Sequence, residues 1–227
     1  VVHMLLAMLA PILLVLGAPI TLALRALPAT TDRRYPGARA WIVAALHSRP
    51  VRLLTNPVIA AVLWVGGLYV MYFSDAYEYA LRNHPAHLAL YLHFLLSGYL
   101  FFAVLISPDP LPRRVPHMAR LVVLMASLAF HAFFGVTLMS MTDVIAADWF
   151  TEVARPWGLD PLTDQRTGGG IAWGVGEIPA YAVAIVLFTQ WIQADEREQR
   201  RLDRAADRDG DAALEAYNTW LRENAGR

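Results

Sequence analysis

Residues 119–141 read ARLVVLMASLAFHAFFGVTLMSM, and this stretch indicates how the chain folds. A helix of this length, rising about 1.5 Å per residue, can cross a hydrocarbon core about 30 Å thick. One imidazole, His131, lies inside the apolar run, and Met139 and Met141 lie where the run ends. The stretch therefore predicts a membrane-spanning helix that carries imidazole and thioether groups in one half.

The rest of the chain repeats this pattern. Of its 227 residues 57% are hydrophobic, which is too apolar for a soluble domain of this size. A window of about 19 residues finds further apolar stretches at 1–24, 56–73, 86–106 and 171–192. We therefore predict an all-α, polytopic transmembrane helix bundle of about five spanning helices over residues 1–193, followed by a charged helical tail over residues 194–227.

Charge in the connections predicts the orientation. Arginine exceeds acid in 25–52 and 107–120, whereas 74–85 and 142–170 hold few arginines and several carboxylates. Since positive connections stay inside, the N-terminus should lie outside and the tail in the cytoplasm. The tail carries a thin apolar stripe at Leu214, Tyr217 and Leu221. It is either a solvated helix broken near Gly210 or a docking helix for a partner.

Composition also restricts the chemistry. Without cysteine, the chain can form no disulfide, thiolate metal site or thiol nucleophile. A net charge of zero gives no general attraction to nucleic acid, so we expect a lipid membrane and no nucleic acid as partner. The outer connections show neither a Ser, His and acid constellation nor an HExxH motif. We therefore expect a protein that is not an enzyme.

Histidine and methionine gather in the predicted outer half of the spans, and Met8 lies one helical turn from Met4. Thioether and imidazole are ligands that suit Cu(I), which favours soft donors. We predict that Cu(I) is received at the outer rim and held deeper by histidines, with carboxylates orienting the imidazoles. The predicted metal site consists of His3, Met4, His93, His131, Met139, Met141, Asp143 and Glu177.

Other interpretations of the same residues stay open. A single methionine in a membrane helix is ordinary packing, and intramembrane His93, His131 or Glu177 can form structural hydrogen bonds between helices. His93 and His131 could instead be the axial ligands of a haem b. The glycines at 168–170 could precede a helix start that binds an anion, or form a re-entrant turn.

Long motifs along the chain resemble a known family. They are HMLLAMLAPILLVLGAPITLALRALP at 3–28, HFLLSGYLFF at 93–102, ISPDPLPRR at 106–114, FHAFFGVTLMSMTDVIAADWF at 130–150 and DQRTGGGIAWGVGEIP at 164–179. In this order they resemble the CtaG-like assembly factors of caa-type cytochrome c oxidase. In actinobacteria such domains resemble the C-terminal part of proteins that begin with a CopD-like copper-transport domain, and we expect the same here.

The resemblance implies an integral assembly factor of the bacterial plasma membrane, a metallochaperone of the respiratory chain that handles copper for a haem-copper oxidase. Its partners would be cytochrome c oxidase subunits or a respiratory supercomplex. The alternative is an accessory or scaffold subunit that stays bound to the oxidase and carries no metal.

Overall fold

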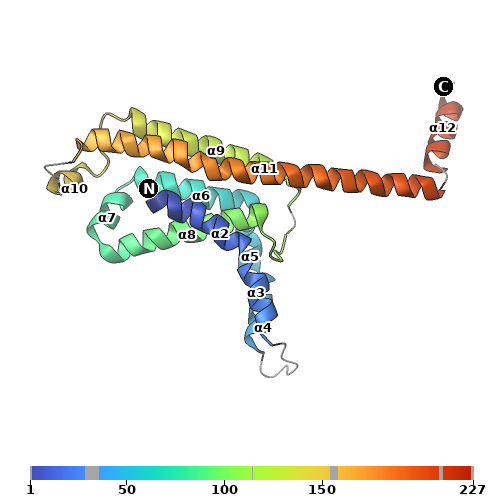
Figure 1. Cartoon of the computed structure of the whole chain (residues 1–227), viewed down its shortest axis with the longest axis horizontal. Helices are drawn as coiled ribbons and strands as arrows, with labels where there is room; N and C mark the ends of the chain where they lie inside the picture. Colours follow the sequence, from blue (N-terminus) through green and yellow to red (C-terminus); the bar gives the residue numbers. More distant parts are fainter. Residues whose placement is uncertain (1, 29–35, 114, 154–157, 210–211, 226–227) are drawn as a thin grey trace. The chain divides into compact units, whose positions relative to one another are not determined.

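The computed structural model describes residues 2–28, 36–113, 115–153, 158–209 and 212–225, and these contain helices and no strand (Figure 1). The elements are α1 (Val2–Met4), the π-helix η1 (Leu5–Leu9), α2 (Ala10–Leu16), α3 (Pro19–Ala26), α4 (Ala38–Leu46), α5 (Arg49–Leu54), α6 (Pro57–Tyr72), α7 (Ala76–Arg82), α8 (His84–Ile106), α9 (His117–Ser140), α10 (Ala147–Glu152), α11 (Pro161–Asp209) and α12 (Ala212–Asn224). They form two compact units, Val1–Leu187 and Phe188–Arg227.

Among the described residues, four helical stretches are long and apolar enough to cross a membrane: Val2–Ala26, His84–Ile106, His117–Ser140 and Pro161–Arg208. A fifth is possible if α6 and α7, which meet at a 75° bend, together make one broken span. The predicted fold class is therefore confirmed. The apolar stretch at 56–73 yields a helix of only 16 residues, about 24 Å long, which is short for a complete crossing.

The glycines at 168–170 lie inside a helix, so both interpretations of them, a helix start after the glycines and a re-entrant turn, were wrong. Helix α11 begins at Pro161, and Gly169 and Gly170 lie against α9. A Cβ on Gly169 would lie 2.9 Å from Leu138 Cβ, and one on Gly135 would lie 2.8 Å from Trp173 Cβ. Only small residues allow two helix backbones to approach this closely. The two helices run side by side in Figure 1.

Around Pro11, the N-terminal helix contacts α6 and α8. Because proline has no N–H, the carbonyl of Ala7, four residues earlier, lacks its helical donor. The indole N–H of Trp64 in α6 donates to this carbonyl at 2.9 Å. Gly98 of α8 packs against the same place, since a Cβ there would lie 2.8 Å from Pro11 Cγ. Trp64 is buried and stacks on Phe101 at 4.4 Å.

The first span contains a break at Gly17 and Ala18, where Ala18 has a left-handed φ of 48°. The helix resumes as α3, and the carboxylate of Asp109 caps its N-terminus from the α8–α9 connection. Asp109 accepts from the backbone N–H of Ile20 at 3.2 Å and from the N–H and hydroxyl of Thr21 at 2.7 and 2.6 Å. One buried acid thus satisfies donors that the break leaves open.

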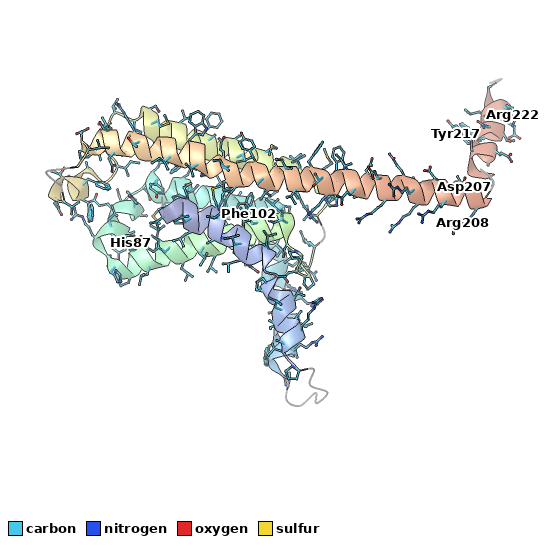
Figure 2. The ribbon with its side chains drawn as sticks, in the orientation of Figure 1. His87, Phe102, Asp207, Arg208, Tyr217 and Arg222 are labelled. Carbon is cyan, nitrogen blue, oxygen red and sulfur yellow. The ribbon has the colours of Figure 1, made fainter. Side chains whose placement is uncertain are left out.

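In the second unit, α12 exposes the predicted apolar stripe at Leu214, Tyr217 and Leu221. Tyr217 also stacks with Trp220 at 6.1 Å, and Figure 2 shows Tyr217 together with Arg222 on this helix. Helix α11 ends at Asp209 and α12 begins at Ala212, so the predicted break at Gly210 lies outside the described residues. The domain boundary after residue 193 and the orientation of the termini stay predictions.

Candidate functional site

Three donor side chains from separate elements meet at Gly176 of α11. The position of a Cβ on Gly176 would lie 2.7 Å from Cε1 of His131, 3.0 Å from the sulfur of Met4 and 3.5 Å from the sulfur of Met8. His131 comes from α9, whereas Met4 and Met8 stand four residues apart along α1 and η1. A side chain at residue 176 would fill this space, so a glycine is required for the three groups to share it.

His131 is the most isolated polar group of this site. Its side chain is 1% exposed, and neither ring nitrogen has a hydrogen-bond partner within the described chain. The ring lies parallel to Trp64, with centroids 5.9 Å apart and planes 7° apart. Because buried polar atoms are almost always hydrogen-bonded, the two unpaired nitrogens make His131 a candidate ligand-binding residue. A neutral imidazole has one free lone pair that could bind a metal ion.

His3 adds a third unpaired ring nitrogen. Its Nδ1 lies 3.0 Å from the hydroxyl of Tyr72, while its Nε2 is buried and has no partner among the described residues. When Nδ1 carries the proton and donates to Tyr72, Nε2 presents its lone pair. The His3 ring stacks on Phe94, with ring centroids 4.2 Å apart. The rings of His3 and His131 both lie beside Phe134, each with its centroid 6.4 Å from that of Phe134. We refer to His3, Met4, Met8 and His131 as the His–Met cluster.

A cavity of about 290 Å³ reaches the His–Met cluster from the ends of α9 and α11. Its lining includes His3 and Met4 together with the polar side chains of Tyr77, Asp164 and Gln165. The lining also contains Val144, Ile145 and Phe150 of the connection between α9 and α11. The cavity therefore offers a route between the protein surface and two members of the cluster.

Gln165 fixes the segment beside this cavity. Its side-chain oxygen accepts from the N–H of Ile145 at 2.7 Å, and its side-chain NH₂ donates to the carbonyl of Asp143 at 3.1 Å. Arg166 adds a bond to the carbonyl of Met141 at 3.1 Å. These contacts satisfy backbone groups directly after α9 and thereby define one wall of the cavity.

The structure does not bring all the predicted ligands together. The His93 ring packs against Gly67 of α6, and no ring contact joins it to His131 in the described chain. Met139 is 38% exposed and packs beside Gly169 and Gly170 instead of facing the cluster. The haem alternative, which needs His93 and His131 on one group, gains no support from these contacts.

The other three predicted residues also lie apart from Gly176 or face elsewhere. Met141 is half-buried against the core, and the exposed carboxylate of Asp143 accepts from the Thr142 hydroxyl at 3.3 Å. Glu177 follows Gly176 in sequence, but its carboxylate accepts from the hydroxyl of Tyr181 at 3.2 Å. If only His, Cys, Asp and Glu are considered, the described residues contain no group of three that could hold a metal ion.

The prediction omitted Met8 from the site. Its sequence signal was present, since Met4 and Met8 are one helical turn apart on the same apolar helix. Met8 is 1% exposed, and its sulfur lies near that of Met4 at Gly176. The site is thus formed mainly of sulfur and imidazole, with aromatic rings around it.

The described helices form an all-α protein with four or five candidate membrane spans, and the His–Met cluster brings imidazole and thioether groups together in it. Residues 1–194 match the family described as cytochrome c oxidase caa3 assembly factor (Caa3_CtaG), and the chain belongs to this family. The family predicted from the sequence motifs is thereby confirmed.

Curated relatives extend the match into the tail. The chain is 47% identical over 222 residues, 97% of its length, to the uncharacterized proteins Mb0105 of Mycobacterium bovis and MT0111 of Mycobacterium tuberculosis. It is 45% identical to the uncharacterized protein ML1998 of Mycobacterium leprae. The chain spans about a third, 34%, of the length of each of these relatives. No solved structure matches the chain.

Proposed function

We propose that this chain is a membrane-embedded assembly factor that binds Cu(I) at the His–Met cluster and delivers it for the maturation of cytochrome c oxidase. The family assignment supports a role in oxidase assembly. The observation that carries the copper proposal is the convergence of two thioethers and His131 on Gly176. In addition, three ring nitrogens of His3 and His131 have no partner among the described residues.

The donor set suits Cu(I) better than other cargo. Thioether sulfur and imidazole nitrogen are soft or intermediate donors, whereas Mg²⁺ and Ca²⁺ require oxygen. All four side chains can act as neutral ligands, so a singly charged ion leaves less charge uncompensated in an apolar interior than a divalent ion does. The aromatic walls of Trp64, Phe94 and Phe134 limit the access of water to the site.

The cavity supplies the route for the ion. The carboxylate of Asp164 would raise the local concentration of cations at the cavity, and the hydroxyl of Tyr72 would hold His3 in the tautomer that offers Nε2. In this proposal the chain carries out no bond-making chemistry. It holds the ion, shields it from water and passes it on.

A Cu(I) titration against a competing chelator, with the purified protein in detergent, tests the proposal. Met8→Leu keeps the side-chain volume and removes the sulfur, and we expect it to weaken Cu(I) binding by about tenfold or more. Met139→Leu is the matched control because Met139 is exposed and lies away from the His–Met cluster. Equal affinities of the two variants would contradict a site at Gly176.

A second candidate function is that of a metal-free accessory subunit of the oxidase. It is favoured by an almost wholly apolar groove of about 450 Å³ on α6 and α9, lined by Val62, Gly66, Tyr69 and Phe130 among others. Such a subunit would co-purify with the oxidase whatever its copper content. If His131→Ala leaves both oxidase copper and oxidase activity unchanged while the complex persists, this second function replaces the first.

A further inference from the structure

A second polar cavity lies at the opposite ends of α8 and α9 from the His–Met cluster. It has a volume of about 800 Å³ and is formed by the end of α8, the α8–α9 connection and the first turn of α9. Its lining includes Arg113, His117 and Arg120. We propose that this cavity binds the phosphate group of an anionic phospholipid. The proposal rests on the membrane location proposed above and is independent of copper.

The arginines of this cavity are not neutralised by carboxylates. Neither Arg113 nor Arg120 forms an ion pair with any described acid. Arg120 is held in place by neutral groups, since its Nε–H donates to the carbonyl of Val115 at 2.8 Å and a terminal N–H to that of Leu105 at 3.1 Å. These bonds orient the guanidinium and leave further N–H groups free for an anion.

The one acid in the described lining, Asp109, already accepts hydrogen bonds from within the protein. Asp109 is 6% exposed, and both of its oxygens accept hydrogen bonds from the first turn of α3. Its charge is therefore partly compensated by the positive end of that helix. The cavity keeps a positive balance although a carboxylate contributes to its lining.

His117 and the start of α9 add donors. Nδ1 of His117 is buried without a hydrogen-bond partner in the described chain, and an anion would supply one. α9 is 24 residues long, and no side chain caps its N-terminus, where Pro116 is the N-cap residue. The free N–H groups of its first turn and the helix dipole favour negative charge at this point.

The position of the cavity indicates a lipid as the source of the phosphate. α8 and α9 are both candidate membrane spans, and the cavity lies where they end, at the level expected for lipid headgroups. Apolar Ala103, Val104 and Leu111 line it beside the arginines, which suits a headgroup with acyl chains attached. Basic pockets between spans, on the side with excess arginine, are typical sites for anionic lipids.

The test measures binding of dioleoylphosphatidylglycerol to the full chain in dodecyl maltoside, by native mass spectrometry, beside dioleoylphosphatidylcholine. Arg113→Gln removes an exposed cation that forms no hydrogen bond or ion pair with the described residues, so the fold should persist. We expect phosphatidylglycerol to bind more tightly than phosphatidylcholine, and Arg113→Gln to weaken it about fivefold. Arg52→Gln is the matched control, because Arg52 is exposed on α5 outside the cavity.

Equal losses in Arg113→Gln and Arg52→Gln, or equal binding of the two lipids by the unmodified chain, would overturn the proposal. Inorganic phosphate forms a separate arm. If phosphate alone stabilises the protein in a manner that depends on Arg113, while phosphatidylglycerol binds no better than phosphatidylcholine, the ligand is free phosphate and not lipid. The Cu(I) affinity of Arg113→Gln should equal that of the unmodified chain. A negative result for lipid binding would therefore leave the copper proposal unaffected.

Discussion

At the scale of single residues, Gly176 is the position on which the His–Met cluster depends. The space that a methyl group would take there is already occupied by His131 and by the sulfurs of Met4 and Met8. Gly174, two residues earlier on the same helix, has no neighbour within 4 Å of its Cβ position. A side chain added at residue 176 would thus meet three neighbours, whereas one added at residue 174 would meet none within 4 Å.

This contrast gives a matched pair of variants. Gly176→Ala should destabilise the protein by about 1–3 kcal/mol through overpacking and should weaken Cu(I) binding. Gly174→Ala should leave Cu(I) binding unchanged and should stabilise the helix by up to about 1 kcal/mol. Thermal unfolding in detergent and the chelator titration measure both effects. Similar behaviour of the two variants would show that residue 176 does not border the site.

The sequence predicted some members of the cluster and could not predict the others. His3, Met4 and His131 were recognisable because each is a ligand type placed in an apolar span. Met139 and His93 satisfied the same criterion, yet Met139 is exposed and His93 packs on Gly67. A sequence shows the depth of a residue along its helix, but the face that meets a neighbour depends on how ridges pack into grooves, which involves every residue of both helices.

At the scale of helices, the bond from Trp64 to the Ala7 carbonyl holds the Met-bearing segment in position. Trp64→Phe keeps an aromatic ring for Phe101 and His131 but leaves the carbonyl without its donor. We expect a loss of about 1–3 kcal/mol in the free energy of unfolding. Pro11→Ala in the Trp64→Phe background restores an N–H within the helix and should recover part of the loss. No recovery would show that ring packing alone was responsible.

A second link between elements joins α7 to α10. Two terminal nitrogens of Arg82 donate to the carboxylate of Glu152 at 2.7 and 2.9 Å, and these bonds hold the pKa of Glu152 below its ordinary value. Because the folded-state pKa is lowered, the link is present at neutral pH and is lost as the pH falls through that lowered value. Both side chains are exposed, so its effect on global stability should be small.

Amide hydrogen exchange of residues 147–152 measures this link. Glu152→Gln should lower the protection factors of α10 at neutral pH and should remove the further loss of protection that we expect of the unmodified protein in acid. Asp148→Asn changes a carboxylate of the same helix that forms no described ion pair, and it should have little effect. If the two variants exchange alike, the contact with Arg82 does not hold α10.

The sequence predicted correctly those helices that are defined by a long apolar stretch. The stretches at 86–106 and 119–141 correspond closely to α8 and α9, because an apolar helix in lipid must satisfy all its backbone bonds internally. The start of α11 was predicted too late, since glycine disfavours an isolated helix. Its close packing on α9 offsets that preference, and this contact joins residues far apart in the sequence.

At the scale of the whole molecule, the absence of cysteine makes the topology directly measurable. Single cysteines can be introduced without a background of native thiols. With the N-terminus outside and the tail inside, a cysteine at Asp160 should react with a membrane-impermeant maleimide in intact cells, and one at Glu198 should react only after lysis. The opposite pattern would invert the predicted orientation and would place the His–Met cluster on the cytoplasmic side.

The π-helix η1 places one extra residue in the N-terminal helix. A π-turn holds one residue more than an α-turn, so it is equivalent to a one-residue insertion in an ordinary helix. Deleting Leu5 or Leu6 would return the segment to regular α-helix with the flanking residues on their present faces. If the turn instead closed to an α-helix with all its residues kept, everything before it would rotate by about 100° relative to α2. His3 and Met4 would then move away from Gly176 while Met8 stayed. The π-turn therefore determines whether the His–Met cluster contains four donor side chains or only Met8 and His131.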